Sequence, residues 1–264
     1  MLNERTSEPR HQTPTEPTAP PRIGELVSDL VRQLENTGQL GTHWQPTLVT
    51  NQDRGRAAAE LARKVGERHA GCCFDNYAVT EKHAEDRPSQ SEVVEQLRNF
   101  ATEFPNRIRR GGGLVLYGRP GTGKDHLAIA AGFEVVLRHG YTLDWINGLE
   151  LFAEIRRLIG RDGDEREYLR RFEKPAVLIV SDPLPPKSDA SAYNADVLFR
   201  MFDRRYRAKK STWVTMNVAD GEEAERRLAS AIVDRVRDGS LCLECNWPSH
   251  RRPVDLCRNS FDDS

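Results

Sequence analysis

The sequence predicts an α/β fold in which helices cover both faces of a mainly parallel sheet. Two apolar runs, LVLY at 114–117 and VLIV at 177–180, lack the alternation of half-exposed strands, and such runs are typical of strands buried on both faces. From residue 111 to residue 245, strand candidates alternate with helix-length periodic segments, which is the order of successive βαβ units. A glycine-rich turn directly follows the first apolar run.

The composition narrows the class of protein. The chain has 264 residues and a formal net charge of −1, so general attraction to nucleic acid or membrane is not expected and any such binding needs a local patch. No apolar run approaches the roughly 20 residues of a membrane span, and the amino-terminal residues lack the apolar centre of a signal peptide. Five cysteines fit a reducing compartment better than a disulfide framework. We therefore predict a cytoplasmic protein with no membrane partner.

Before the main domain, the sequence predicts a tail and a small helical appendage. The first 22 residues hold five of the fifteen prolines, a composition typical of disorder. Segments 23–34 and 56–68 have helical apolar spacing. The appendage could be a handle for a partner or a helix packed on the main domain, and both interpretations stay open. The predicted organisation is a disordered tail over 1–22, the appendage over 23–70, the main domain over 71–258 and a second tail over 259–264.

Apolar spacing and turn residues then define the elements of the main domain. A basic segment, Arg107 to Arg110, precedes three glycines, and we expect a flexible connector there that could contact DNA. The predicted strands cover 114–117, 142–146, 176–180, 212–216 and 241–245. The predicted helices cover 90–102, 124–138, 149–159, 165–172, 192–209 and 222–236, the last with a possible break.

The turn after the first strand has the pattern of a phosphate-binding loop. Residues 118–124 read GRPGTGK, and glycines at such positions expose backbone N–H groups that can wrap a triphosphate. The helix that starts at Lys124 directs the positive end of its dipole to the same place, while the lysine supplies a charge for the outer phosphates. The pattern departs from G-x-x-x-x-G-K-[ST] at its last position, where Asp125 replaces a hydroxyl residue.

Polar residues end two further strands. In P-loop ATPases an apolar strand ends in acids that hold Mg²⁺ and orient water; here Ser181 takes the first such position and Asp182 the second. Asn217 ends the next strand, where it could reach the γ-phosphate or the attacking water, or simply cap the next segment. Arg235 and Arg251 lie near the carboxyl end. Such arginines sense the γ-phosphate of a neighbouring subunit in oligomeric ATPases, although surface salt bridges are the simpler interpretation.

Taken in order, these segments resemble the AAA+ ATPases of the DnaC/IstB type, the bacterial helicase loaders and the helper ATPases of insertion elements. The matching segments, which span about residues 70–252, are CFDNY, GRPGTGKDHLAIAAG, VLIVSD, TMN, IVDRVRDG and SHRR. The resemblance implies a P-loop NTPase with a five-stranded parallel sheet in the order 5-1-4-3-2. The residues before 70 carry no such resemblance.

The resemblance also implies roles for individual residues. Asp182 would polarise water, Asn217 would act as a sensor, Arg251 would sense the bound nucleotide, and Arg235 would act on a neighbouring subunit and hold a self-oligomer together. The residues expected to hold ATP are Phe74 and Tyr77 on the adenine side and Gly118, Arg119, Pro120, Gly121, Thr122, Gly123, Lys124, Asp125 and His126 around the phosphates.

Two departures from the family pattern fall on the same expected metal site. The family has threonine where this chain has Asp125 and aspartate where it has Ser181. One hypothesis is that the two ligand types have exchanged places, so that one carboxylate and one hydroxyl still face Mg²⁺. Against it, a carboxylate next to the phosphates is electrostatically unfavourable unless a metal screens it. We predict ATP binding with weak or altered hydrolysis, while near-normal hydrolysis or loss of binding stay as alternatives.

The cysteines offer a less favoured metal site. Cys242 and Cys245 have C-x-x-C spacing, and Cys72, Cys73 and Cys257 could add thiolates. However, residues three apart on a predicted strand point to opposite faces, so buried free thiols are the better interpretation.

The favoured function is an ATP-dependent loader that acts on a replicative helicase on DNA, with single-stranded DNA preferred over duplex. The alternatives are a transposition helper that binds duplex DNA and a transposase, and an ATP-binding scaffold without turnover. A phosphoryl-transfer kinase is disfavoured because no acceptor-site pattern is present.

Overall fold

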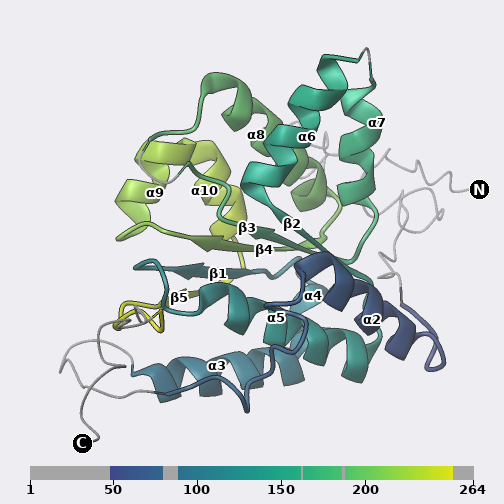
Figure 1. The fold of residues 1–264 in the computed structure, drawn as a ribbon, viewed down its shortest axis with the longest axis vertical. Coiled ribbons are helices and arrows are strands. Elements are labelled where there is room, and N and C mark those ends of the chain that lie inside the picture. The colour runs from purple at the N-terminus through teal and green to yellow at the C-terminus, as the bar shows by residue number, and fades with distance from the viewer. Residues whose placement is uncertain (1–47, 80–88, 162, 186–187, 252–264) are drawn as a thin grey trace, which may run out of the picture. The chain divides into compact units, whose positions relative to one another are not determined.

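The computed structural model describes residues 48–79, 89–161, 163–185 and 188–251. Its centre is a five-stranded, all-parallel sheet in the order β2-β3-β4-β1-β5, which confirms the expected order read from the opposite edge (Figure 1). The strands are β1 (Leu114–Tyr117), β2 (Leu143–Asn147), β3 (Val177–Ser181), β4 (Ser211–Met216) and β5 (Leu241–Glu244). Each lies within one residue of its predicted bounds.

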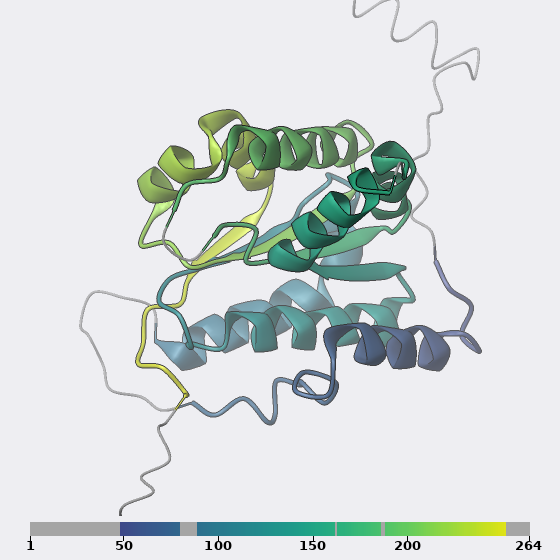
Figure 2. The same ribbon diagram turned by 45° about the horizontal axis from the view of Figure 1, so that its top comes forward.

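The helices occupy two layers, one on each face of the sheet, as Figures 1 and 2 show. One layer contains α2 (Arg54–Val65), α3 (Gln90–Thr102), α4 (Phe104–Ile108) and α5 (Lys124–Glu134), which the π-helix η1 (Val135–His139) continues. The other contains α6 (Gly148–Ile159), α7 (Glu165–Arg170) with the 3₁₀-helix η2 (Arg171–Glu173), α8 (Ala192–Arg207), α9 (Gly221–Leu228) and α10 (Ser230–Arg237). The possible break in the last helix is confirmed, and it falls at Ala229, whose φ is 84°. No helix among the described residues is long and apolar enough to cross a membrane.

Apolar burial explains why both faces are covered. Strand β3 is buried at all five positions, so a helical layer must close each side. On the α3 side, Phe100, Phe104 and Trp213 meet with ring centroids 5.4–5.7 Å apart, a spacing at which aromatic rings attract beyond simple area burial. A second apolar cluster fills the space between the sheet and the layer of α6 and α8–α10.

Helix α2 packs on the main domain. Leu61 and Val65 are buried in one cluster with Ile129 of α5, and the ammonium of Lys64 lies 2.7 Å from a carboxylate oxygen of Asp144 on β2. Of the two interpretations of the appendage, packing therefore holds for this helix. The segment 23–34 and both predicted tails lie outside the described residues.

The expectation of a flexible connector at Arg107 to Arg110 is wrong. Arg107 and Ile108 end helix α4, Ile108 is fully buried, and the N–H groups of Arg110 and Gly111 bond to the carbonyls of Arg107 and Ile108. The reason is tertiary packing: the helix begins with Phe104, whose ring packs against Phe100 in the aromatic cluster.

A buried arginine ties the starts of β3 and β4 to the helical layer. The Arg205 side chain is fully buried, and its guanidinium donates to carbonyl oxygens before both strands and to a threonine hydroxyl. The acceptors are the carbonyls of Phe172, Pro175, Ala176 and Ser211 and Oγ1 of Thr212. Because each donor has a partner, the buried charge is compensated by dipoles, and the start of β4 is fixed relative to β3.

The parallel register gathers the polar ends of the strands at one edge. Ser181 of β3 is paired with Thr215 of β4, and Tyr117, directly before the glycine-rich turn, is paired with Met216. Ligands of open parallel sheets bind beyond the carboxyl ends of the strands. The phosphate-binding loop, Asp182 and Asn217 therefore converge at the expected edge.

Candidate nucleotide site

The glycine-rich turn is closely covered by two other segments. At Gly118, where φ is 131°, a Cβ would lie 2.3 Å from the carbonyl oxygen of Cys245. At Gly123, where φ is 86°, a Cβ would lie 2.6 Å from the Tyr77 ring. Both positions need glycine for space as well as for conformation, and the loop is thereby locked between β5 and the Tyr77 segment.

Lys124 is held at the centre of the loop. Its ammonium donates to the carbonyls of Gly118 and Arg119, at 3.1 and 2.7 Å, and to Oδ1 of Asn217, at 2.8 Å. Burial lowers the pKa of Lys124, while the nearby carboxylates of Asp182 and Asp125 act in the opposite direction. The lysine therefore links the loop to the end of β4.

Asp125 joins the same loop to β3 and β4. Its Oδ1 accepts hydrogen bonds from the hydroxyls of Ser181, at 2.9 Å, and Thr215, at 2.6 Å. The structure thus brings Asp125 and Ser181 together, as the exchange hypothesis requires, and adds Thr215 as a third oxygen group. Sequence reasoning missed Thr215, because its position opposite Ser181 depends on the register of β3 against β4.

Asp182 occupies a strained backbone conformation beside Asn217. Its φ is 45°, a region that costs a non-glycine residue energy and that concentrates at functional sites. Oδ1 of Asp182 accepts a hydrogen bond from the Asn217 amide at 2.7 Å. Burial first, and then the charge of Asp125, raise the pKa of Asp182 to about 6. Asn217 therefore contacts both Lys124 and Asp182, which a residue that only caps the next segment would not do.

Tyr77 and the chain after β5 form the other wall. The Tyr77 hydroxyl and the Trp247 indole both donate to the carbonyl of Thr122, at 2.7 and 2.8 Å. The backbone N–H of His250 donates to the carbonyl of Gly121, and its ring meets the Tyr77 ring edge-on, with centroids 5.2 Å apart. These contacts hold the carbonyls of Gly121 and Thr122 in hydrogen bonds to this wall, which leaves backbone N–H groups of the loop available to a ligand.

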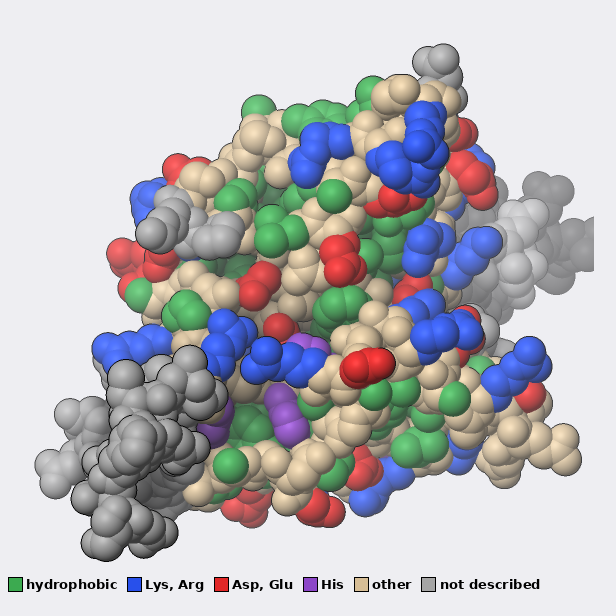
Figure 3. Space-filling model, viewed as in Figure 1, with side chains coloured by type: hydrophobic (Ala, Val, Ile, Leu, Met, Phe, Trp, Pro, Cys, Tyr) green, Lys and Arg blue, Asp and Glu red, His purple; other side chains and the backbone are tan. Residues whose placement is uncertain are grey.

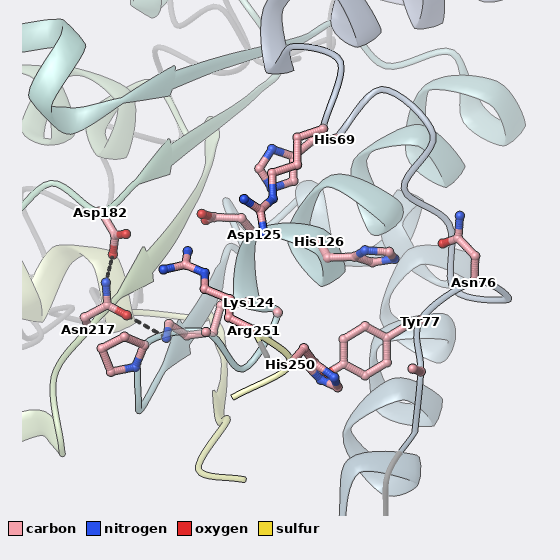
Figure 4. Close-up of a pocket in the computed structure, with 15 residues that line it drawn as sticks. His69, Asn76, Tyr77, Lys124, Asp125, His126, Asp182, Asn217, His250 and Arg251 are labelled. Carbon is pink, nitrogen blue, oxygen red and sulfur yellow. Dashed lines mark hydrogen bonds between the residues drawn. The ribbon is translucent and has the colours of Figure 1, made fainter. Parts of the chain in front are cut away.

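These walls enclose a cavity of about 360 Å³, drawn in Figure 4. Of the residues predicted from the sequence, the cavity is lined by Tyr77, Pro120, Gly121, Gly123, Lys124, Asp125, His126, Asp182, Asn217 and Arg251. In Figure 3, histidine side chains lie in a recess bordered by Lys and Arg side chains.

Other predicted residues lie outside the lining. Phe74 is buried in the core under the Arg98 guanidinium, which lies 5.1 Å from its ring centroid. Gly118, Arg119 and Thr122 contribute backbone carbonyls to the loop instead, and Ser181 reaches the site through Asp125.

Arg235 lies elsewhere in the subunit. Its Nε donates to Asp203 on α8, and its guanidinium lies 4.7 Å from the Phe199 ring centroid. A residue that acts on a neighbouring subunit need not line its own pocket, so its predicted role stays a prediction.

Sequence reasoning missed five lining residues, Arg68, His69, Asn76, Ala78 and His250. Asn76 and His250 belong to segments that were already recognised, CFDNY and SHRR, so their neighbours were a usable signal. Arg68 and His69 follow α2 and lie outside every motif, so only the packing of that helix reveals them. In Figure 4, His69 lies near Asp125.

The donor set at Asp125 fits a magnesium ion. Carboxylate and hydroxyl oxygens are the ligands that Mg²⁺ prefers, together with water and substrate phosphates. Asp125, Ser181 and Thr215 supply such oxygens within one hydrogen-bonded group. No cluster of three or more His, Cys, Asp or Glu side chains suited to a metal occurs among the described residues.

Comparison with known sequences decides the family. The sequence model of the IstB-like ATP binding proteins matches residues 72–255. The chain belongs to this family. The match starts just before CFDNY and includes every motif around the cavity, so the family confirms the predicted resemblance and supports ATP as the ligand of the cavity.

Curated relatives cover nearly the whole chain. The replicative helicase loader DnaC of Escherichia coli K12 is 29% identical over 243 residues, which are 88% of this chain and 94% of that protein. DnaC of Buchnera aphidicola (Schizaphis graminum) is 28% identical and covers 80% of this chain and 87% of its own. A putative ATP-binding protein of insertion sequence IS5376 from Geobacillus stearothermophilus is 34% identical over 148 residues, 54% of this chain and 57% of that protein.

Solved structures agree on the fold. A crystal structure of the DnaC helicase loader superposes with a TM-score of 0.57 at 22% identity, covering 68% of this chain and 99% of that one. The replication initiator DnaA bound to AMPPCP and single-stranded DNA gives a TM-score of 0.51 at 16% identity, over 68% of this chain and 50% of that one. At these identities the likeness shows the AAA+ fold and no more.

Proposed function

We propose that this protein is an ATP-dependent loader that acts on a replicative helicase on DNA. The observation that carries the proposal is the connected set Lys124–Asn217–Asp182 at the phosphate-binding loop. It occurs in a chain that aligns with the DnaC loaders over 88% of its length. A loader needs to couple the occupancy of this pocket to contacts with its partner, and the set joins the loop to the ends of two strands.

The residues have distinct tasks toward the triphosphate. The backbone of the loop and the Lys124 ammonium bind its phosphates, because two loop carbonyls and Oδ1 of Asn217 hold that ammonium beside the loop. Tyr77 closes the side expected to face the base. The Asp182 carboxylate accepts a hydrogen bond from the attacking water and so holds it in place. Asn217 orients that carboxylate. Arg251 adds positive charge at the phosphates.

Mg²⁺ is proposed to bind with ATP at Asp125 and Ser181, where it would neutralise phosphate charge. With the carboxylate moved to the position directly after Lys124, we expect slower turnover than a threonine there would give, because Asp125 opposes the build-up of negative charge on the phosphates. Arg235 is proposed to act on the neighbouring subunit in an oligomer.

The decisive measurement is ATP turnover with and without single-stranded DNA. A loader predicts turnover that DNA stimulates and that falls about 10³-fold or more in Arg235→Ala, as for other arginine fingers, while ATP affinity stays unchanged because Arg235 does not line the cavity. Lys124→Ala is the matched control that loses ATP binding itself. Turnover that is absent in the wild type, with tight ATP binding, would establish the scaffold without hydrolysis instead.

One alternative function has an observation in its favour. The match to the IS5376 protein has higher identity, 34%, over a shorter part of the chain. It favours a transposition helper that binds duplex DNA and a transposase. Stable binding to duplex DNA in preference to single strands, without any effect on helicase loading, would support this alternative and contradict the loader.

A further inference from the structure

A second polar cavity lies at the opposite edge of the sheet from the nucleotide pocket. It measures about 300 Å³ and lies around the residues that precede β1, start β4 and precede β5. We call it the basic hollow and define it by its charged and aromatic lining residues Arg110, Tyr206, Arg207, Lys209, Lys210, Arg235 and Asp238. Since the strands between the two edges are four to six residues long, the hollow is separated from the phosphates by the length of the sheet.

The charge of the basic hollow is strongly positive. Five of its lining residues are cationic and one, Asp238, is anionic, so the lining carries 5 − 1 = +4. Some of this charge is already used: Arg207 and Arg235 both pair with Asp203, and Lys210 donates to the carbonyls of Glu173 and Lys174. Arg110 and Lys209, in contrast, have no ion-pair partner among the described residues and are exposed.

Lys209 is kept in a conformation that favours glycine. Helix α8 ends in a Schellman arrangement, in which the N–H of Lys209 bonds to the carbonyl of Tyr206 and that of Lys210 to the carbonyl of Arg205. Lys209 therefore occupies the position after the cap, which is usually glycine, and its φ is 50°. A lysine at a left-handed position costs stability that a glycine would not cost, and an outlier of this kind is a reason to look for a function of the side chain.

An aromatic ring stands at the same hollow. Tyr206 is 46% exposed, so its ring is accessible, and its hydroxyl is fixed by a hydrogen bond to Asp238. Cations beside an exposed, oriented ring are the combination that binds single strands, because the cations follow the phosphates while a base stacks on the ring. A duplex keeps its bases stacked inside and offers none to such a ring.

From this arrangement we propose that the basic hollow binds the phosphate backbone of single-stranded DNA, with Arg110 and Lys209 on phosphates and one base stacked on Tyr206. The inference rests on the proposed function, in which DNA is a partner, and adds the place where the strand binds. Because this place is remote from the subunit's own nucleotide pocket, one subunit can bind ATP and the strand at the same time, while Arg235, at the wall of the hollow, is left for its proposed role on the neighbouring subunit.

The test measures binding of a fluorescent single-stranded oligonucleotide by anisotropy over a series of salt concentrations, with ATP present. The variant is Arg110→Ala combined with Lys209→Gly. Removing two phosphate contacts should flatten the slope of log affinity against log salt by about 1.4, at roughly 0.7 per contact for single strands. Lys209→Gly relieves the left-handed strain, so the loss cannot be attributed to unfolding, and a melting curve checks this. Arg56→Ala combined with Arg63→Ala, which removes two exposed arginines on α2, is the charge-matched control and should leave the slope unchanged.

The ring is tested separately. Tyr206→Leu should weaken binding of the single strand at least about fivefold, the lower end of a stacking contribution, whereas Tyr206→Phe should retain affinity because it keeps the ring. A duplex of the same sequence should be insensitive to both changes.

The outcomes separate this inference from the proposed function. If the wild type binds the strand and the double variant binds it with the same affinity and salt slope, the hollow is not the site, while the loader proposal stands. If Tyr206→Leu weakens duplex and single strand equally, the stacking is refuted. If the wild type binds no DNA with ATP present, both proposals fail.

Discussion

Asp125 is the residue whose change tests the nucleotide site most directly. The substitution Asp125→Asn keeps the side-chain oxygen that accepts hydrogen bonds from Ser181 and Thr215 but removes the negative charge. The fold should therefore survive, with a melting temperature within a few degrees of the wild type. What changes is the electrostatic relation between this side chain, the phosphates and the metal.

The expected effect has opposite signs with and without Mg²⁺. Two unit charges about 8 Å apart interact by about 2 kcal/mol at an effective dielectric constant near 20, so without metal the neutral variant should bind ATP about 10- to 30-fold more tightly. With Mg²⁺, the carboxylate becomes a charged ligand, and its loss should weaken binding by about 1.5–3 kcal/mol, or roughly 10- to 100-fold.

The assay is a titration of ATP, monitored by calorimetry, in excess EDTA and in excess Mg²⁺. Asp196→Asn, which changes an exposed carboxylate on α8, is the matched control and should shift neither affinity. The reasoning is refuted if wild-type affinity is the same in both buffers, or if Asp125→Asn shifts affinity in the same direction in both.

Two further predictions concern stability and the loop. Arg205→Met should lower the free energy of unfolding by about 3–5 kcal/mol, because four buried carbonyls and one part-buried hydroxyl lose their hydrogen bonds from the guanidinium. Chemical denaturation measures this loss, and Arg204→Met, at a half-exposed ion pair, should change stability by no more than about 1 kcal/mol; equal losses would contradict the argument. Gly123→Ala should weaken ATP binding at least tenfold, since its Cβ would collide with the Tyr77 ring at a left-handed φ. In the same titration Gly55→Ala, where a Cβ meets nothing, should retain full affinity, and a Gly123→Ala variant that binds ATP normally would show that the loop can shift.

Much of the fold was predictable because its signals are local. Continuous apolar runs such as 177–180 identify buried strands, and the βαβ alternation restricts their connections, while the sheet order came from the resemblance of the motifs in sequence. The phosphate-binding loop and Lys124 were predictable for the same reason, since the strand, the glycines and the helix start are contiguous. The predicted exchange partner of Asp125 was found because Ser181 ends a strand that the motif order places beside the loop.

Other features depended on contacts between distant segments. Arg68 and His69 reach the pocket because Leu61 and Val65 pack α2 against α5. The spacing of residues in the sequence does not predict that packing. Phe74 and Tyr77 are three residues apart in an irregular segment, where no periodicity decides which of the two rings lines the cavity. The basic segment at Arg107 was wrongly predicted to be a connector, because the helix there is stabilised by packing in the aromatic cluster, which depends on tertiary contacts.

The sequence by itself determined the class of sheet, the phosphate-binding loop and the two departures at Asp125 and Ser181, since each rests on residues adjacent in the chain. Only the tertiary structure decided that Thr215 joins those two, because that contact depends on the register of β3 against β4. It alone placed Arg110 beside Lys209, 99 positions later in the sequence. The physical reason is the same in both cases: side chains far apart in the chain meet only where buried apolar surfaces fix the distance between their backbones.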